Sequence, residues 1–205
     1  MTLLAGGASL KELAEAAKEC RACPLYTGAS QTVFGEGSSR APIVLVGEQP
    51  GDHEDREGSP FVGPAGKMLW EAIEGAGLNP AEVYVTNAVK HFKWTPGKSK
   101  RLHAKPNRRE VEACMPWLQA EVQLLSPRVI VGLGSTACQA MLGPTVRITK
   151  DRGSIAEWNG LPVVVTFHPS AILRTPDPEA RSAMMADLVE DLGRAKGFVK
   201  QPERS

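Results

Sequence analysis

Four short apolar runs constrain most strongly what this chain can fold into. They cover residues 42–46, 83–86, 128–133 and 162–167, and continuous apolar runs of this length are typical of strands buried on both faces. Segments with helical periodicity separate them. Because strands that alternate with helices form mostly parallel sheets covered on both faces, we expect an α/β fold with three layers, α/β/α.

Helices are expected between and around these strands. Ser9 and Glu12 form a capping-box pattern, and Glu110 stands three residues after Asn107 in the same way. The expected helices cover residues 10–19, 64–76, 107–125, 135–142 and 178–196. The length of 205 residues suits one domain, so we expect a single domain at 1–205, with an inserted basic loop at about 93–107 and a loose tail at about 197–205.

The composition narrows the class of protein. With 42% hydrophobic and 23% charged residues, the chain has the composition of a soluble globular protein. No stretch approaches the ~18 apolar residues of a membrane span, and the start of the chain lacks the basic leader of a secretory signal. We therefore expect a cytoplasmic protein without membrane contact, and a monomer by default.

The net charge of +1 hides an uneven distribution of basic residues. Residues 90–109 contain 8 of the 24 lysines and arginines and no acidic residue, which leaves 16 basic against 23 acidic residues, or −7, elsewhere. Phe92 and Trp94 are interleaved in this basic strip. Such a strip suits a phosphate backbone with exposed bases nearby, although a solvated surface loop has the same composition.

Three polar side chains follow the first, second and fourth strands: Glu48, Asn87 and His168. Ligands of such sheets bind beyond the carboxyl ends of the strands, so we expect these residues to converge on one cleft. There a carboxylate can orient water or accept a proton, an amide can pair with a nucleobase edge, and an imidazole can stabilise a developing anion. Each residue also has a structural alternative, because turns use the same side chains.

Two further residues suit the same cleft. Phe61 lies between turn residues, where its ring is either a platform for a flat ligand or a core anchor below a loop. His103 is flanked by Lys100, Arg101 and Lys105, and neighbouring cations favour the neutral form of an imidazole. Because a neutral imidazole is a nucleophile, His103 either performs covalent chemistry or contacts phosphate.

Four cysteines are present, Cys20, Cys23, Cys114 and Cys138. The CxxC at 20–23 follows a helix, whereas a thioredoxin-like dithiol follows a strand, and a third cysteine near the start of a distant helix favours a cluster or a zinc site. Cys138 lies in the middle of a helix, where a small buried thiol is the ordinary role. His91 is the other candidate for a fourth ligand.

Five motifs resemble, in order and over nearly the whole chain, those of the iron–sulfur uracil-DNA glycosylases. They are GEQPGD at 47–52, PFVGPAG at 60–66, TNAVKHF at 86–92, ACMPWL at 113–118 and HPSAILR at 168–174. Three features more narrowly resemble the UdgX-type branch, whose members become covalently attached to uracil-containing DNA. These features are Gln49, His91 in place of the cysteine in the family-4 VKC motif, and the inserted loop that bears His103.

For the cysteines, the resemblance implies a [4Fe–4S] cluster held by Cys20, Cys23, Cys114 and, in place of a fourth thiolate, His91. It also implies that Cys138 is not a ligand. We expect the cluster to be structural, because nothing in the sequence supplies an electron-transfer partner.

For the cleft, the resemblance implies a uracil-DNA glycosylase fold and excision of uracil, mainly from single-stranded DNA, since a stacked base has to be flipped out first. Phe61 then stacks on uracil, Asn87 pairs with its Watson–Crick edge, and His168 stabilises the negative charge on the leaving base. His103 attacks C1′ of the sugar and stays bonded to it, with Glu48 as the proton acceptor. The remaining implied residues are Gln49, Gly51 and Asp52 in the uracil pocket, and Lys100, Arg101, Lys105 and Arg174 on the DNA. Such a protein is expected on the nucleoid.

Three alternative functions share some of these features. A conventional family-4 glycosylase has the same fold but uses water as the nucleophile, and the inserted loop with His103 counts against it. A non-catalytic uracil-DNA binding protein keeps the recognition groups, but it does not need both Glu48 and His168. An iron–sulfur redox protein is suggested by the CxxC alone.

Overall fold

A six-stranded sheet forms the centre of the structure, a computed structural model that describes residues 8–199. The strand order is β1-β3-β2-β6-β8-β7. The four apolar runs form the inner strands, which all pair in parallel. These strands are β2 (Ile43–Gly47), β3 (Val83–Asn87), β6 (Val129–Leu133) and β8 (Leu161–Thr166). The α/β fold with a mostly parallel sheet, predicted from the sequence, is thereby confirmed.

Two edge strands were not predicted from the sequence. β1 (Glu36–Gly37) pairs antiparallel with β3, and β7 (Ile155–Trp158) pairs antiparallel with β8. Asn159 and Gly160 connect β7 to β8, and both have positive φ, as a tight two-residue hairpin turn requires. Edge strands such as β7 are partly exposed, so they lack the continuous apolar run that marks the inner strands.

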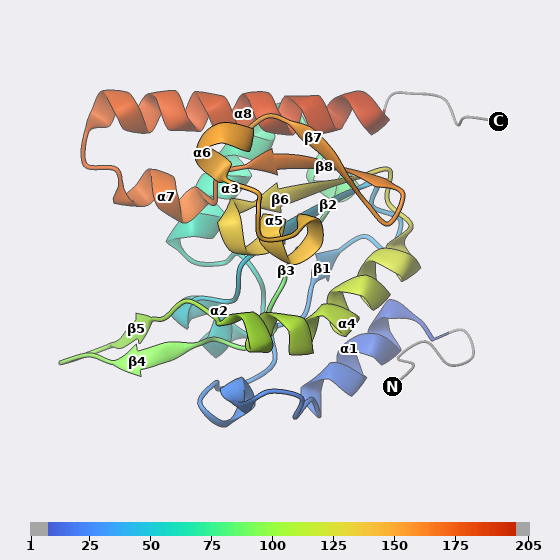
Figure 1. Cartoon of the computed structure of the whole chain (residues 1–205), viewed down its shortest axis with the longest axis vertical. Coiled ribbons are helices and arrows are strands. Elements are labelled where there is room, and N and C mark those ends of the chain that lie inside the picture. Colours follow the sequence, from blue (N-terminus) through green and yellow to red (C-terminus); the bar gives the residue numbers. More distant parts are fainter. Residues whose placement is uncertain (1–7, 200–205) are drawn as a thin grey trace.

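Helices cover both faces of the sheet (Figure 1). On one face, α3 (Pro64–Gly75), α7 (Pro169–Arg174) and α8 (Pro178–Val199) pack against apolar strand residues that include Ile43 and Leu45. On the other face, α4 (Arg108–Leu125) and α5 (Gly134–Leu142) pack against residues that include Val44 and Val46. Successive side chains of a strand point to opposite faces, and β2 is therefore apolar on both.

A third apolar cluster lies outside the sheet, between α1 (Leu10–Lys18) and α4. Leu13 and Ala17 from α1 meet Trp117 from α4 there. Both predicted capping boxes are present, at Ser9 for α1 and at Asn107 for α4. The 3₁₀ helix η1 (Pro24–Thr27) follows the CxxC and brings Leu25 into the same cluster.

The basic loop and the end of the chain differ from their expected forms. The loop contains a β-hairpin of β4 (Trp94–Pro96) and β5 (Arg101–His103), which projects from the molecule on the same side as α7 (Figure 1). Residues 197–199, expected in a loose tail, are helical, because Phe198 and Val199 pack against the core. The rest of that tail, 200–205, lies outside the described residues.

Three short helices complete the described part of the chain and were not predicted from the sequence. They are α2 (Asp52–Glu57), η2 (Pro80–Glu82) and α6 (Ile148–Asp151). None of the helices within residues 8–199 is long and apolar enough to span a membrane.

Candidate active site

A cleft of about 780 Å³ lies at the carboxyl ends of the parallel strands. Glu48 follows β2, Asn87 is the last residue of β3, and His168 lies two residues after β8; all three line the cleft. Other residues singled out in the sequence also line it, namely Gln49, Gly51, Phe61, His103, Lys105 and Arg174. Asp52, Lys100 and Arg101 do not. The fold therefore brings these residues together from five separate segments of the chain.

Gly47, the last residue of β2, allows three of these groups to meet. A Cβ atom at this position would lie 2.7 Å from Cζ of Phe61 and 3.5 Å from Nε2 of His168, and closer still to Oδ1 of Asn87. Only glycine leaves this space open. The rings of Phe61 and His168 are stacked with centroids 6.2 Å apart. A phenyl ring, an amide and an imidazole thus surround one small volume above Gly47.

Phe61 reaches this position through an unusual backbone conformation. Its φ is +55°, in the left-handed region that bulky residues rarely adopt. A Cβ atom on Gly66 would overlap the main chain of Phe61, so the close approach of α3 requires glycine there. Because strained backbone persists where packing enforces it, often at functional sites, the conformation of Phe61 supports a role beyond filling the core.

Asn87 presents an amide without a protein partner to the cleft. The residue is only 3% exposed, yet its side chain makes no hydrogen bond to any residue between 8 and 199. A buried amide normally has its donors and acceptor satisfied. The Asn87 amide is therefore placed to recognise a bound group that offers both a donor and an acceptor, such as the edge of a nucleobase.

His168 is held as a neutral hydrogen-bond donor. Its Nδ1 accepts a hydrogen bond from the main-chain N–H of Ser170 (3.2 Å) and lies 2.9 Å from the Ser170 hydroxyl. Burial, with smaller contributions from Arg174 and His103, lowers the pKa of His168 to about 4. Because Nδ1 accepts, the single ring proton of the neutral imidazole is on Nε2. That nitrogen faces the volume above Gly47.

The two carboxylate oxygens of Glu48 contact two different residues. The hydroxyl of Thr136, from α5, donates to Oε2, while Oε1 lies 3.4 Å from Nε2 of His103. The carbonyl of Glu48 accepts a hydrogen bond from the main-chain N–H of Val89 (3.0 Å). The carboxylate is thus fixed at one oxygen, and the other faces the histidine of the hairpin.

Gln49 fastens the basic hairpin to the turn after β2. Its Nε2 donates to the carbonyls of Lys93 (3.2 Å) and Ala104 (3.1 Å), and its Oε1 accepts the N–H of Lys93 (3.1 Å). The same Nε2 lies 2.9 Å from Nε2 of His103. An amide NH₂ group has two protons and can only donate, so the contact with His103 is a hydrogen bond only when Nε2 of His103 is unprotonated and shares a proton with one of the two carbonyls. That state leaves the nucleophilic lone pair on Nε2.

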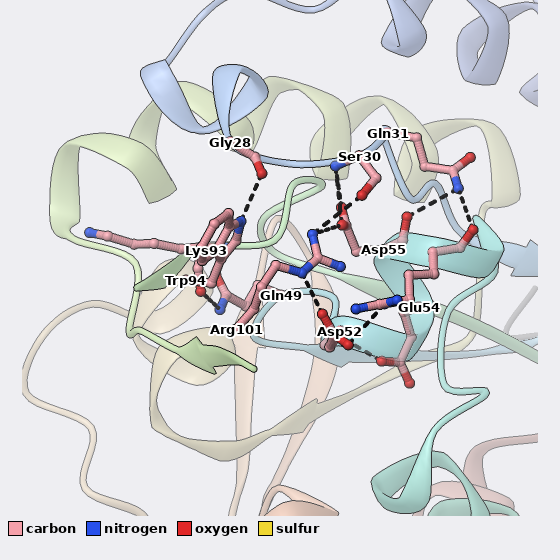
Figure 2. Close-up of polar contacts among 12 residues, drawn as sticks. Gly28, Ser30, Gln31, Gln49, Asp52, Glu54, Asp55, Lys93, Trp94 and Arg101 are labelled. Carbon is pink, nitrogen blue, oxygen red and sulfur yellow. Dashed lines mark hydrogen bonds and ion pairs between the residues drawn. The ribbon is translucent and has the colours of Figure 1, made fainter. Parts of the chain in front are cut away.

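Arg101 anchors the hairpin from its other side (Figure 2). Its guanidinium pairs with Asp52 at 2.5 Å and with Asp55 at 2.6 Å, and it lies over the rings of Phe92 and Trp94. Asp52 and Arg101, expected in the uracil pocket and on the DNA, therefore hold the hairpin in place. Their predicted contacts with a ligand remain predictions.

Ion pairs in the folded protein neutralise half of the cations in the basic strip. Four of its eight cations form ion pairs with acidic residues from outside the strip: Lys90 with Glu121, Lys93 with Glu110, Arg101 with Asp52 and Asp55, and Arg108 with Glu112. Lys98, Lys100, Lys105 and Arg109 have no acidic partner within residues 8–199. These four are the cations of the strip that remain available to phosphate.

Three of the four cysteines gather between α1 and α4. Cys20, Cys23 and Cys114 belong to one cluster of packed side chains, and Trp117 Nε1 donates to the sulfur of Cys20 (3.2 Å). Burial raises the pKa of the Cys23 thiol, and it raises that of Cys114 to about 12. Cys138 lies elsewhere, in α5, and its thiol donates to the carbonyl of Gly132 (3.2 Å).

His91, the expected fourth ligand, is buried and neutral. Burial lowers its pKa, and its Nε2 lies 2.9 Å from the hydroxyl of Thr32. In residues 8–199, no group of three or more His, Cys, Asp or Glu side chains is placed to hold a metal ion. The three thiols nevertheless share one packed cluster, and N–H groups donate to the sulfurs of Cys20 and Cys114. N–H groups that point at the sulfurs are typical of iron–sulfur sites.

Two parts of the cleft were not predicted from the sequence: the segment after the third apolar strand, and Glu54. The third apolar strand, like the others, ends at the cleft, where Gly134 and Ser135 line the wall and Thr136 holds Glu48. Ligands bind beyond the carboxyl ends of such strands, so the end of the third apolar strand was the signal in the sequence that pointed to these residues. Glu54 was also missed. Its carboxylate accepts the N–H groups of Gly51 (3.0 Å) and Gly63 (2.8 Å) and so joins two loops of the cleft.

The parallel sheet and the cleft at its strand ends define an α/β protein with a candidate ligand site at the carboxyl edge of the sheet. The sequence profile described as Uracil DNA glycosylase superfamily matches residues 34–193, and the chain belongs to this superfamily.

Curated relatives match most of the chain. The type-4 uracil-DNA glycosylase of Thermotoga maritima is 39% identical over 191 residues, which cover 92% of this chain and 94% of the relative. That of Pyrobaculum aerophilum is 36% identical, with 82% and 86% covered. That of Sulfurisphaera tokodaii is 34% identical, with 96% and 87% covered.

Proposed function

We propose that this protein excises uracil from DNA, mainly from single strands, and then remains covalently bonded through His103 to C1′ of the abasic sugar. The observation that carries the proposal is the position of His103. An inserted hairpin places its imidazole on the cleft wall, 3.4 Å from the Glu48 carboxylate and against the Gln49 amide. The three relatives reported above are named as type-4 uracil-DNA glycosylases, which supports the excision step.

Uracil is recognised above Gly47. Phe61 stacks on the flipped base, and the amide of Asn87, which has no protein partner, pairs with the Watson–Crick edge. Uracil offers an N–H donor beside carbonyl acceptors, whereas cytosine has an exocyclic amine that requires a different arrangement of partners. Flipping the base costs least in a single strand, and this cost favours single-stranded substrates.

His168 stabilises the leaving base. As the bond between C1′ and N1 stretches, its electron pair moves onto uracil, and negative charge grows on the carbonyl oxygens. The Nε2–H of neutral His168 donates to that charge without any earlier proton transfer. Removing one preorganised donor of this kind costs about 10²–10³ in rate. The sugar is left as a cation that resembles an oxocarbenium ion.

His103 captures the sugar cation in place of water. The lone pair of a ring nitrogen forms the new bond to C1′, while the electron pair of the broken bond leaves with uracil. The imidazolium that results carries its remaining proton on the other ring nitrogen, and Glu48, whose carboxylate lies beside the ring, accepts that proton once the ring has turned toward the sugar. The half-exposed His103 reaches the sugar at the mouth of the cleft.

The DNA backbone crosses the cleft mouth beside the available cations. Lys105 and Arg174 line the cleft, and Lys98 and Lys100 extend along the projecting hairpin. Arg174 also donates to the Ser170 hydroxyl (3.1 Å), which contacts His168. A phosphate bound at Arg174 is thus adjacent to the group that stabilises the leaving base.

A [4Fe–4S] cluster held by Cys20, Cys23, Cys114 and His91 forms part of the proposal. When bound, the cluster supplies a structural cross-link. The three thiols and the N–H donors at their sulfurs support this assignment, as does the similarity to the type-4 enzymes.

A labelled single-stranded oligonucleotide with one uracil tests the proposal. We expect a band at the summed mass of protein and DNA that survives heat and detergent, together with release of one free uracil per adduct. DNA that alkali cleaves without a shifted band would instead show an ordinary turnover enzyme. DNA that stays intact and unshifted would contradict both the excision and the capture.

A further inference from the structure

We propose that Lys90 is a positioning residue for base recognition, which holds the main chain of Asn87 from below the cleft and joins it to the cysteine cluster. The inference rests on the proposed function, because it assigns Lys90 to the reaction at that cleft. Lys90 makes no contact with the cleft itself, so it acts through Asn87.

The side chain of Lys90 is fully enclosed. It is 1% exposed, and the Glu121 carboxylate with which it pairs is 0% exposed. The ammonium also donates to the hydroxyl of Thr86 (2.6 Å) and to the carbonyl of Asn87 (2.8 Å). An ammonium group has three donors, and each of them has a partner. The arrangement fixes the peptide that follows Asn87.

The main chain of the same segment is fixed on every side. The N–H groups of Ala88 and Val89 donate to the carbonyls of Gly47 (2.9 Å) and Glu48 (3.0 Å). The N–H of Lys90 donates to the sulfur of Cys114 (3.2 Å). Residues 87–90 therefore run from the cleft to the cysteine cluster, and the Lys90 side chain folds back to hold the start of this segment.

Stability alone does not account for a buried lysine here. Burying two charges carries a large desolvation cost, and apolar residues of similar size often replace such pairs without loss of stability. The position of the Asn87 peptide, which Lys90 holds, does however affect base recognition. The Oδ1 atom of Asn87 occupies the space above Gly47 beside Phe61 and His168, so a small rotation of the Asn87 peptide displaces the amide from the base.

Removal of both charges together tests this inference. Lys90→Met with Glu121→Gln leaves no unpaired buried charge, and the Gln side chain still offers an acceptor to Tyr84 and Gly35, which contact Glu121. The probe is an oligonucleotide with 2′-fluoro-2′-deoxyuridine, whose glycosidic bond resists cleavage because fluorine disfavours the sugar cation. Its affinity relative to the matching 2′-fluoro-2′-deoxycytidine oligonucleotide, which differs at the Watson–Crick edge, reports base recognition apart from chemistry.

We expect this preference for uracil over cytosine to fall about tenfold or more, since each hydrogen bond to a charged group contributes strongly, while binding of the cytidine oligonucleotide is unchanged. In the background of Asn87→Ala, the pair of substitutions should have little further effect, because residues that act as a unit are not additive. Asp191→Asn is the matched control. It removes another fully buried carboxylate outside the cleft lining, and we expect it to keep the preference.

An unchanged preference in the folded double variant, or an additive loss on top of Asn87→Ala, would overturn the role of Lys90. If the double variant does not fold, Lys90→Gln replaces it, and a preference equal to that of the native protein would have the same meaning. Failure of the proposed function is separate. In that case the native protein itself neither releases uracil nor prefers the fluorinated uracil oligonucleotide.

Discussion

The amide nitrogen of Gln49 lies 2.9 Å from Nε2 of His103, across 54 positions of the sequence. The same amide holds the main chain at Lys93 and Ala104 on both strands of the hairpin. The proposed nucleophile is therefore positioned by a residue of the turn that also bears Glu48. A side chain without these donors leaves the hairpin attached through the ion pairs of Arg101 and Lys93 and the hydrogen bond of Trp94 to Gly28.

Gln49→Met tests this positioning. The hairpin loses several hydrogen bonds at once, each a net contribution of about 1 kcal/mol, and we expect the rate of adduct formation to fall about tenfold or more. Uracil release should fall less, because Phe61, Asn87 and His168 do not depend on the hairpin. Equal losses of release and capture would contradict a role specific to His103.

His103→Ser removes the proposed nucleophile but leaves the base-recognition groups in place. We expect free uracil and an abasic site with repeated turnover, measured as more than one uracil released per protein. His53→Ser, at an exposed histidine outside the cleft lining, is the control and should retain the adduct. A full yield of adduct from His103→Ser would show that another residue captures the sugar.

Thr136→Val keeps the shape of its side chain but removes the hydroxyl that donates to Glu48. A hydrogen bond to a charged group contributes about 1.5–3 kcal/mol, so we expect a loss of about 10- to 100-fold in the rates of release and capture. Thr136→Ser retains the hydroxyl and should restore most of the activity. Full activity in the valine variant would mean that Glu48 needs no such support.

The pKa of His168, lowered to about 4 by burial and then by Arg174 and His103, can be measured by NMR. We expect the imidazole signals of His168 to titrate well below the ordinary value of 6.5. Arg174→Gln should raise this pKa, because it removes a nearby cation. A titration midpoint near 6.5 in the native protein would contradict the neutral donor proposed for catalysis.

The same shift affects stability. The imidazole of His168 becomes protonated near pH 6.5 in the unfolded chain, but only near pH 4 in the folded chain. The neutral His168 therefore contributes its full share to stability above about pH 6.5, and that share declines as the pH falls toward 4. His168→Gln, measured by denaturant unfolding, should flatten the pH dependence across this window.

The cluster is tested by metal content. We expect iron and acid-labile sulfide in equal amounts in the purified protein, with a marked loss in Cys114→Ser and in His91→Ala. Cys138→Ser is the control, because its thiol bonds within α5 and β6, and it should keep the iron. Zinc without iron, or an unaltered cluster spectrum in His91→Ala, would contradict the ligand set.

Local sequence patterns accounted for much of the fold. The inner strands could be predicted because parallel strands buried on both faces must be apolar at every position. Ser9 and Asn107 mark helix starts because the capping box acts within four residues. The edge strand β7 gave no such signal, since one of its faces is exposed.

The candidate site followed from the sequence only in part. Glu48, Asn87 and His168 were recognisable because each comes directly after a strand, and strand ends share one edge of a parallel sheet. Thr136 lies in the first turn of α5, and its contact with Glu48 was not recognisable from the sequence. Likewise, Arg101 was assigned to DNA from its neighbours in the basic strip, whereas Asp52 and Asp55 lie close to it only in the fold.

The sequence by itself thus determined the strands, the helix starts and the residue types of the cleft, because these depend on periodicity and on neighbours a few positions apart. Only the tertiary structure decided which cations are neutralised, how the hairpin is fastened and what Lys90 holds. These outcomes depend on ion pairs and hydrogen bonds between residues far apart in the chain, whose strength varies with distance and burial. Lys90 shows the difference most clearly, since a member of a basic strip became the fully buried partner of Glu121.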